Sequence, residues 1–198
     1  MIRQESVSMD ETSKNPALRL ADPAVEDVRD DGFSLRVDRD LGIAKLRMVP
    51  ADSDASFLSV AGFAPPGTGR EIVCGALAFA WLAPGEWLIT GTPAAVATWL
   101  EDANDIGGDD ILAIDFTHAR VAFELVGSNA RSALAAHCPL DLWPEAFPVG
   151  AVARTLIGDT VMFIARLEDE ARAPRFRIIV DQTVAPYVRR LFASADQL

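Results

Sequence analysis

The chain has 198 residues, of which half are hydrophobic and 24% are charged, a composition too apolar for a disordered chain and too charged for a membrane protein. Its formal net charge is −11, from 29 acidic residues against 18 basic ones. This balance argues against binding to nucleic acid or to an anionic membrane surface, because both require clustered Lys and Arg.

Ten of the eleven excess negative charges lie in two segments. Residues 1–32 carry eight acidic and four basic residues, and residues 101–115 carry six acidic residues and no basic one. Residues 116–198 carry nine of each and are neutral. We interpret residues 1–32 as a flexible acidic N-terminal arm in which the pattern allows a short helix from Pro23 to Arg29, and residues 102–110 as an acidic connector.

Targeting and redox signals indicate a cytoplasmic protein. No apolar run follows the first residues, so no secretory signal is expected. The longest apolar stretch, from Gly75 to Pro84, has about half the length of a membrane span. Cys74 and Cys138 are far apart and have apolar neighbours, which predicts buried thiols in a reducing compartment.

The first half of the folded region begins at Phe33. Alternating apolar residues predict strands at 33–38 and 43–49, joined by a turn at 40–42. Asp52 and Ser53 can cap a short helix. An apolar strand at 73–82 and a strand at 87–90 form a predicted hairpin, and a helix begins at Thr92 and Pro93.

The second half, residues 111–198, repeats this arrangement of elements. Strands are predicted at 111–116 and 121–126, followed by a helix capped by Ser128 and a proline-rich segment at 139–148. Further strands are predicted at 152–157, 161–167 and 176–180, and a last helix is capped by Thr183. The fold class is therefore α+β, with two side-by-side split-βαβ (ferredoxin-like, βαββα) units at 33–105 and 111–198 in one folded domain, 33–198.

Known catalytic and ligand-binding motifs are incomplete in this chain. Residues 126–130 lack the second glycine of a nucleophile elbow, and residues 67–70 lack both the Walker lysine and the third glycine of a dinucleotide loop. The acidic connector lacks the Gly and Glu positions of a calcium loop, and two Cys with two His form no zinc pattern. We expect no catalytic, cofactor-binding or metal site.

Four residues are candidates for contact with a partner: His118, Arg120, Trp143 and Arg154. His118 follows the end of a predicted strand, with Arg120 nearby, and is either functional or a hydrogen-bonded structural histidine. Arg154 lies between apolar residues of a predicted strand; if it faces inward it needs a buried partner, and we expect it to bind a carboxylate within the fold or across an interface. Trp143 lies in the proline-rich segment, where an exposed aromatic side chain would suit a partner surface.

Several segments resemble one known family. They are LAPGEWLI at 82–89, DFTH at 115–118, CPLDL at 138–142 with FPVG at 147–150, and ARTL at 153–156. Their order and spacing, over about residues 33–194, are similar to those of the gamma subunit of heterotetrameric sarcosine oxidase.

This resemblance implies a fold related to the folate-binding aminomethyltransferase of glycine cleavage. It also implies a cytoplasmic complex with alpha, beta and delta subunits that demethylates sarcosine to glycine. Flavin, dinucleotide, folate and zinc would be bound by the partner subunits. In the transferase relatives an Asp stands three residues before a helical Trp and serves the folate amine; here Val96 precedes Trp99.

The expected function is that of a non-catalytic gamma-type subunit with a role in assembly. One alternative is a stand-alone, folate-dependent one-carbon protein of the aminomethyltransferase type. Another is a scaffold of the same fold with a different partner.

Overall fold

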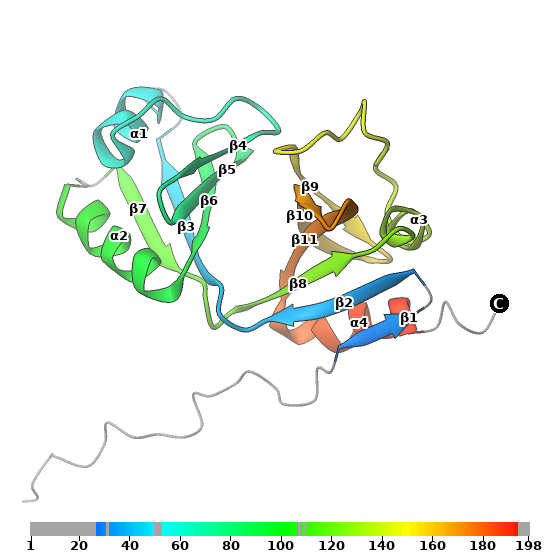
Figure 1. Ribbon diagram of the computed structural model, residues 1–198. Helices are drawn as coiled ribbons and strands as arrows, with labels where there is room; N and C mark the ends of the chain where they lie inside the picture. Colours follow the sequence, from blue (N-terminus) through cyan, green and yellow to red (C-terminus); the bar gives the residue numbers. More distant parts are fainter. Residues whose placement is uncertain (1–26, 31, 50–52, 107, 109, 194–198) are drawn as a thin grey trace, which may run out of the picture.

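The computed structural model describes residues 27–30, 32–49, 53–106, 108 and 110–193. These residues form two antiparallel sheets, and each sheet is covered by helices on one face (Figure 1). The α+β class with two split-βαβ units is confirmed.

The six-stranded sheet has the strand order β1-β2-β8-β11-β10-β9. Its strands are β1 (Val28–Asp30), β2 (Phe33–Asp38), β8 (Arg120–Val126), β9 (Val152–Ile157), β10 (Thr160–Glu170) and β11 (Ala173–Asp181). Its helices are α3 (Ala130–Ala135), the 3₁₀ turn η3 (Gln182–Val184) and α4 (Ala185–Ala193).

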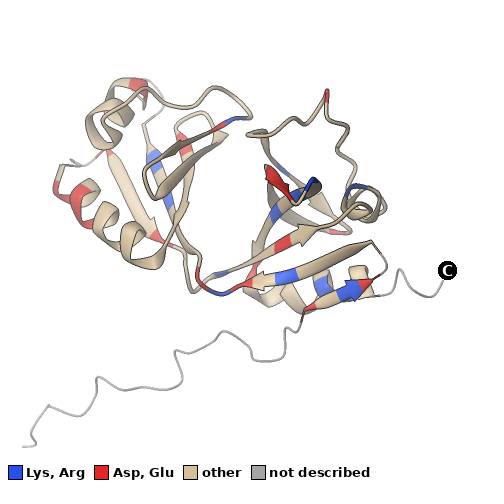
Figure 2. Cartoon of the chain, in the orientation of Figure 1, with Lys and Arg blue, Asp and Glu red and all other residues tan. Residues whose placement is uncertain are grey.

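The five-stranded sheet has the order β4-β5-β6-β3-β7. Its strands are β3 (Gly42–Met48), β4 (Glu71–Cys74), β5 (Leu77–Ala83), β6 (Glu86–Gly91) and β7 (Ile111–Asp115). Its helices are α1 (Ser53–Ala61) and α2 (Pro93–Ile106), and the last turns of α2 carry part of the acidic connector (Figure 2). The run β3-α1-β5-β6-α2-β7 is a split-βαβ unit to which β4 adds one edge strand.

The sheets do not follow the predicted halves at two strands. β2 pairs with β8, with Val37 opposite Phe123, and so enters the sheet built mainly from the second half. β7 pairs with β3, with Ala113 opposite Leu46, and so enters the sheet of the first half. The chain therefore crosses between the sheets twice, from β2 to β3 and from β7 to β8. Alternation predicts which face of a strand is buried but not which strand it pairs with.

Several local predictions differ from the structure, among them the cap of the last helix: Asp181, not Thr183, is the N-cap of the turn η3 that leads into α4. Strand β1 lies within the predicted N-terminal arm and pairs with β2; residues 1–26 of that arm, and most of the helix considered at 23–29, lie outside the described residues. The predicted strand at 73–82 is interrupted at Gly75, whose φ of 60° permits a turn between β4 and β5. Asn129, not Ser128, occupies the N-cap position of α3.

Apolar side chains form one cluster under the helices of each sheet and a third cluster between the sheets. Strand β10 shows the alternation: Met162 and Ile164 belong to the cluster beneath α3 and α4, whereas Phe163 and Ala165 belong to the cluster between the sheets. The six-stranded sheet is therefore buried on both faces near its centre.

Backbone hydrogen bonds also join the sheets, at the starts of β4 and β9. Arg70 forms an antiparallel bridge with Ala151. The N–H of Val152 donates to the carbonyl of Gly69 at 2.9 Å, and the N–H of Glu71 donates to that of Gly150 at 3.1 Å. The two edge strands meet at this point.

Candidate functional site

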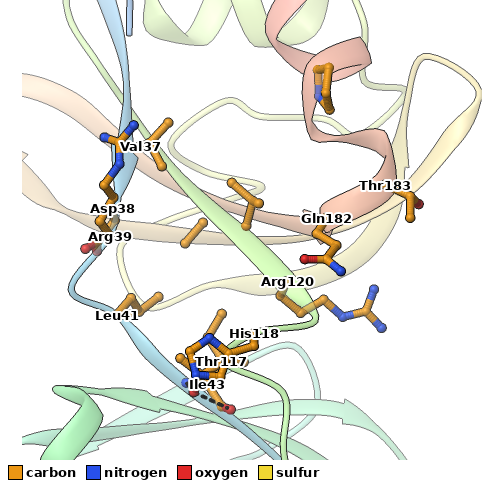
Figure 3. A pocket seen from close by; sticks show the side chains of 13 residues that line it. Val37, Asp38, Arg39, Leu41, Ile43, Thr117, His118, Arg120, Gln182 and Thr183 are labelled. Carbon is orange, nitrogen blue, oxygen red and sulfur yellow. Dashed lines mark hydrogen bonds between the residues drawn. The ribbon is translucent and has the colours of Figure 1, made fainter. Parts of the chain in front are cut away.

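A pocket of about 390 Å³ lies where the chain crosses between the sheets (Figure 3). Both crossovers and the turn η3 contribute to it. Its lining includes the apolar Val37, Leu41, Ile43 and Ala122 and the polar His118, Arg120, Gln182 and Thr183. Two of the four predicted contact residues therefore share one pocket.

The turn that carries His118 is fixed by hydrogen bonds of Thr117. The Thr117 Oγ1 accepts a hydrogen bond from the N–H of Ile43 at 3.0 Å, and the Thr117 N–H donates to Asp115 Oδ1 at 2.7 Å. The His118 side chain is exposed at the pocket, and no described residue forms a hydrogen bond with it. The structure thus does not show His118 as a hydrogen-bonded structural histidine.

Arg120 forms an ion pair with a residue of the neighbouring strand β11. Its Nη1 lies 3.1 Å from Asp181 Oδ2, and its guanidinium lies 5.4 Å from the ring centroid of Phe116. Asp181 also accepts hydrogen bonds from the N–H and the hydroxyl of Thr183. These bonds, together with the charge of Arg120, hold the pKa of the Asp181 carboxyl below its ordinary value.

Arg154 is exposed on β9, the edge strand of the six-stranded sheet. It lies opposite Phe163 and on the same face as Val152, which packs between the sheets. None of the acidic side chains that the structure describes forms an ion pair with it. The carboxylate expected within the fold is therefore not found there, and the expectation of one across an interface stays a prediction.

Arg120 and Leu156, which is two residues beyond Arg154, lie on the same face of the six-stranded sheet, in one row across its strands. Leu156 lies opposite Val161, and Arg120 lies opposite Asp181. Met162 is paired with Val180, so the same register continued by one residue places Val161 beside Asp181. Leu156, Val161, Asp181 and Arg120 therefore form a row across four neighbouring strands, which we call the cross-sheet row.

Trp143 lies apart from this row in the proline-rich segment. The backbone N–H of Trp143 donates to Asp141 Oδ1 at 3.0 Å, and the backbone carbonyl of Trp143 accepts from the N–H of Phe147 at 2.7 Å. Leu142 and Phe147 are buried in the core beneath α3 and α4, while the Trp143 side chain is 68% exposed. The loop is thus anchored on both sides of an exposed indole.

Other residues of the recognised segments are structural. Trp87 is buried, and its ring centroid lies 4.7 Å from that of Phe57. Glu86 forms ion pairs with Lys45 at 2.9 Å and Arg47 at 3.6 Å. Cys138 is buried, and burial raises the pKa of its thiol. By contrast, the side chains of His118, Trp143 and Arg154 are exposed and are not part of the core.

An ionic network that was not predicted from the sequence lies on the inter-sheet face of the six-stranded sheet. Glu124 lies 3.5 Å from Arg36 and 3.9 Å from Arg177, and it also binds Arg175. These residues come from β2, β8 and β11. The only sequence signal for this network was the presence of charged residues at alternate strand positions. Their proximity was not predictable, because β2 pairs with β8 in the sheet built mainly from the second half.

Metal-binding and folate-binding side chains form no site of either kind in the described part of the chain. No group of three His, Cys, Asp or Glu side chains there is arranged to hold a metal ion. Val96 is buried together with Trp99 in the core beneath α1 and α2. No helix among the residues described is long and apolar enough to cross a membrane.

Comparisons with known proteins agree with this arrangement. The fold is similar to that of a heterotetrameric sarcosine oxidase from Corynebacterium sp. U-96 in complex with pyrrole 2-carboxylate, with a TM-score of 0.71 and 22% identity over 87% of this chain and 87% of that chain. It is also similar to glycine cleavage system aminomethyltransferase T from Bartonella henselae, with a TM-score of 0.59 and 16% identity over 83% of this chain and 46% of that chain. Curated proteins gave no match to the sequence. Residues 50–195 match the model of the sarcosine oxidase, gamma subunit family. The chain belongs to this family.

Proposed function

We propose that this gamma-type subunit assembles with the alpha, beta and delta subunits of a cytoplasmic sarcosine oxidase and contributes no catalytic group. The observation that carries the proposal is the family match, which spans residues 50–195 and so includes strands of both sheets. The reaction of the complex would be the oxidative demethylation of sarcosine to glycine. The partner subunits would bind the flavin, dinucleotide, folate and zinc.

The way in which this chain uses its ionisable groups supports a non-catalytic role. Asp181, Glu86 and Glu124 each accept ion pairs from neighbouring Arg or Lys side chains and so stabilise the fold. Val96, at the position where the resemblance requires a folate-binding Asp, is a buried core residue. A valine neither accepts a proton nor pairs with a folate nitrogen.

Exposed side chains of types that are frequent at protein interfaces support an assembly role. Trp143 is anchored by its loop yet open to solvent. Trp and Arg are the residue types most enriched among those that dominate binding energy, and Arg154 adds an exposed cation without an ion pair in the described part of the chain. These side chains give a partner subunit both an apolar anchor and a charge.

Co-expression with the alpha, beta and delta subunits tests the proposal. An affinity tag on this chain should recover all four subunits in equal amounts, with sarcosine-dependent oxygen consumption in the same fraction. The proposal is wrong if this chain stays monomeric while the other three form a stable, active oxidase. Tetrahydrofolate titrated into the isolated chain should give no tight binding; tight binding would contradict the non-catalytic role.

A further inference from the structure

Strand β9 is an edge strand with an open side. It pairs with β10 on one side and is the last strand of the six-stranded sheet (Figure 1). At its start, the N–H of Val152 donates to the carbonyl of Gly69, which lies on the side away from β10. At its end, the N–H of Gly158 donates to the carbonyl of His137 at 2.8 Å, and between these two bonds no backbone hydrogen bond with another described segment covers this side of the strand.

The direction of the Val152 N–H determines which groups of β9 face outward. In an antiparallel pair, successive residues alternate between bonding to the neighbouring strand and pointing away from it. Val152, Arg154 and Leu156 therefore direct their N–H and C=O groups outward, while the residues between them bond to β10. The β9–β10 hairpin, with Ile157 opposite Thr160 across a two-residue turn, fits this phase. The backbone of Arg154 and Leu156 is thus free to pair with another strand.

The side chains next to this open edge are apolar and exposed. Leu156 is 44% exposed, and its cross-strand neighbour Val161 is 49% exposed. Proteins commonly protect edge strands with charged side chains, proline, bulges or covering loops; between Val152 and Ile157 the sequence has one charge, that of Arg154, and no proline. The cross-sheet row continues this surface from Leu156 to the Arg120–Asp181 ion pair.

We propose that an extended segment of a partner subunit adds a strand to β9. Its backbone would pair with Arg154 and Leu156, an apolar side chain would contact Leu156, and a carboxylate would lie against Arg154. This inference rests on the proposed function, because it takes the partner subunits from that proposal and names the surface of this chain that one of them binds. Strand addition of this kind obtains affinity from main-chain hydrogen bonds and specificity from alternate side chains.

Charge distinguishes a partner subunit from a second copy of this chain. Two copies of β9 paired antiparallel about a twofold axis near Arg154 would bring both Arg154 side chains onto one face, directly opposite or diagonal to each other. Like charges in these positions destabilise a strand pair. No acidic residue occurs between Val152 and Ile157 to offset them. A partner strand that carries a carboxylate has no such penalty.

Hydrogen exchange on the purified four-subunit complex tests this inference directly. The amides of Arg154 and Leu156 should exchange rapidly in the isolated chain and at least about tenfold more slowly in the complex. Unchanged exchange at both amides in an intact complex would overturn the inference and leave the proposed function standing. Failure of the wild-type chain to co-purify with the oxidase subunits would overturn both.

Proline substitution provides a matched pair of variants. Leu156→Pro removes an outward N–H without removing a hydrogen bond to β10, and should weaken binding of the partner subunits at least about tenfold. Val73→Pro is the control on edge strand β4. The Glu71 N–H points away from β5, toward Gly150, and the N–H of Val73, two residues further on, points the same way, so this proline too removes no hydrogen bond within the sheet. Val73 is 70% exposed, and its substitution should leave binding within about twofold of wild type. Equal binding losses in both variants would contradict a specific role for β9.

Substitution of Arg154 tests the charge separately and serves if Leu156→Pro does not fold. Arg154→Glu should weaken binding at least about tenfold, whereas Arg154→Lys should retain most of it. Circular dichroism should show native folding for both variants, because Arg154 is exposed. Wild-type binding by Arg154→Glu would overturn the proposed carboxylate contact. If the isolated chain forms a dimer that Leu156→Pro dissociates, the occupant is a second copy and the proposed partner is wrong.

Discussion

Arg177 on β11 donates a hydrogen bond to Thr90 on β6, with 3.3 Å between Nη1 and Oγ1. The two residues belong to different sheets, and Thr90 is only 4% exposed. The Nη2 of Arg177 lies 3.9 Å from Glu124 Oε1 and 4.0 Å from Asp38 Oδ2. One side chain therefore links the five-stranded sheet to the ionic network of the six-stranded sheet.

Removal of this link should destabilise the fold. Arg177→Ala leaves the buried Thr90 hydroxyl without its donor and removes one cation from beside Glu124. We expect the free energy of unfolding, measured in urea at pH 7, to fall by about 1–3 kcal/mol. Arg154→Ala is the control, since Arg154 is exposed without an ion pair in the described structure, and its effect should stay within about 0.5 kcal/mol. Equal effects of the two substitutions would exclude a special role for the bond between the sheets.

Glu71 should make stability depend on pH. Burial raises the pKa of its carboxyl above the ordinary 4.5, although the charge of Arg177 lowers it in part. The folded state therefore binds the proton more tightly than the unfolded state, and stability falls as pH rises from 4.5 through the folded-state pKa. Glu71→Gln should be more stable than wild type at pH 8, and the difference should disappear below pH 4.5. Urea titrations at several pH values measure this, and a less stable Glu71→Gln at pH 8 would contradict it.

The two cysteines should differ in reactivity. Cys74 is exposed on β4, whereas Cys138 is buried, and burial raises the pKa of its thiol. Because the thiolate is the reactive form, a thiol reagent at pH 7.5 should modify Cys74 rapidly and Cys138 only after unfolding. Mass spectrometry of the labelled protein measures the two sites separately. The expectation that both thiols are buried was wrong for Cys74, which follows from the turn at Gly75 that makes β4 a short edge strand.

Trp143 should matter for assembly and not for folding. Because its indole is mostly exposed, Trp143→Ala should leave the free energy of unfolding within about 0.5 kcal/mol of wild type. The affinity for the partner subunits should fall by about 1–4 kcal/mol if the indole fills a partner pocket. Trp87→Ala is the contrasting variant: Trp87 is buried, and its loss should cost about 3–5 kcal/mol of stability. Isothermal titration with the co-purified alpha, beta and delta subunits decides whether Trp143 lies at the interface.

Local patterns in the sequence predicted elements well where one residue type determines the geometry. Phe33, Leu35 and Val37 alternate and form β2, and Thr92 with Pro93 starts α2 as expected. The Thr92 hydroxyl accepts a hydrogen bond from the N–H of Ala95. These features depend on neighbours within a few residues, which the sequence displays directly.

Features that depend on distant residues were not predictable in this way. The exchange of β2 and β7 between sheets depends on strand pairing, and the alternation in Phe33–Asp38 is equally compatible with either sheet. Arg154 was expected to need a carboxylate if it faced inward, but it occupies an exposed edge strand because β9 ends the sheet. Asp181 joins Arg120 only through the β8–β11 register. A candidate contact residue could therefore be named from the sequence, while the surface that it belongs to required the fold.

Native mass spectrometry of the complex recovered through a tag on this chain tests the central claim most directly. We expect one copy each of this chain and of the alpha, beta and delta subunits in a single particle that oxidises sarcosine. An active particle that contains the other three subunits without this chain, while this chain remains free in the same lysate, would contradict it.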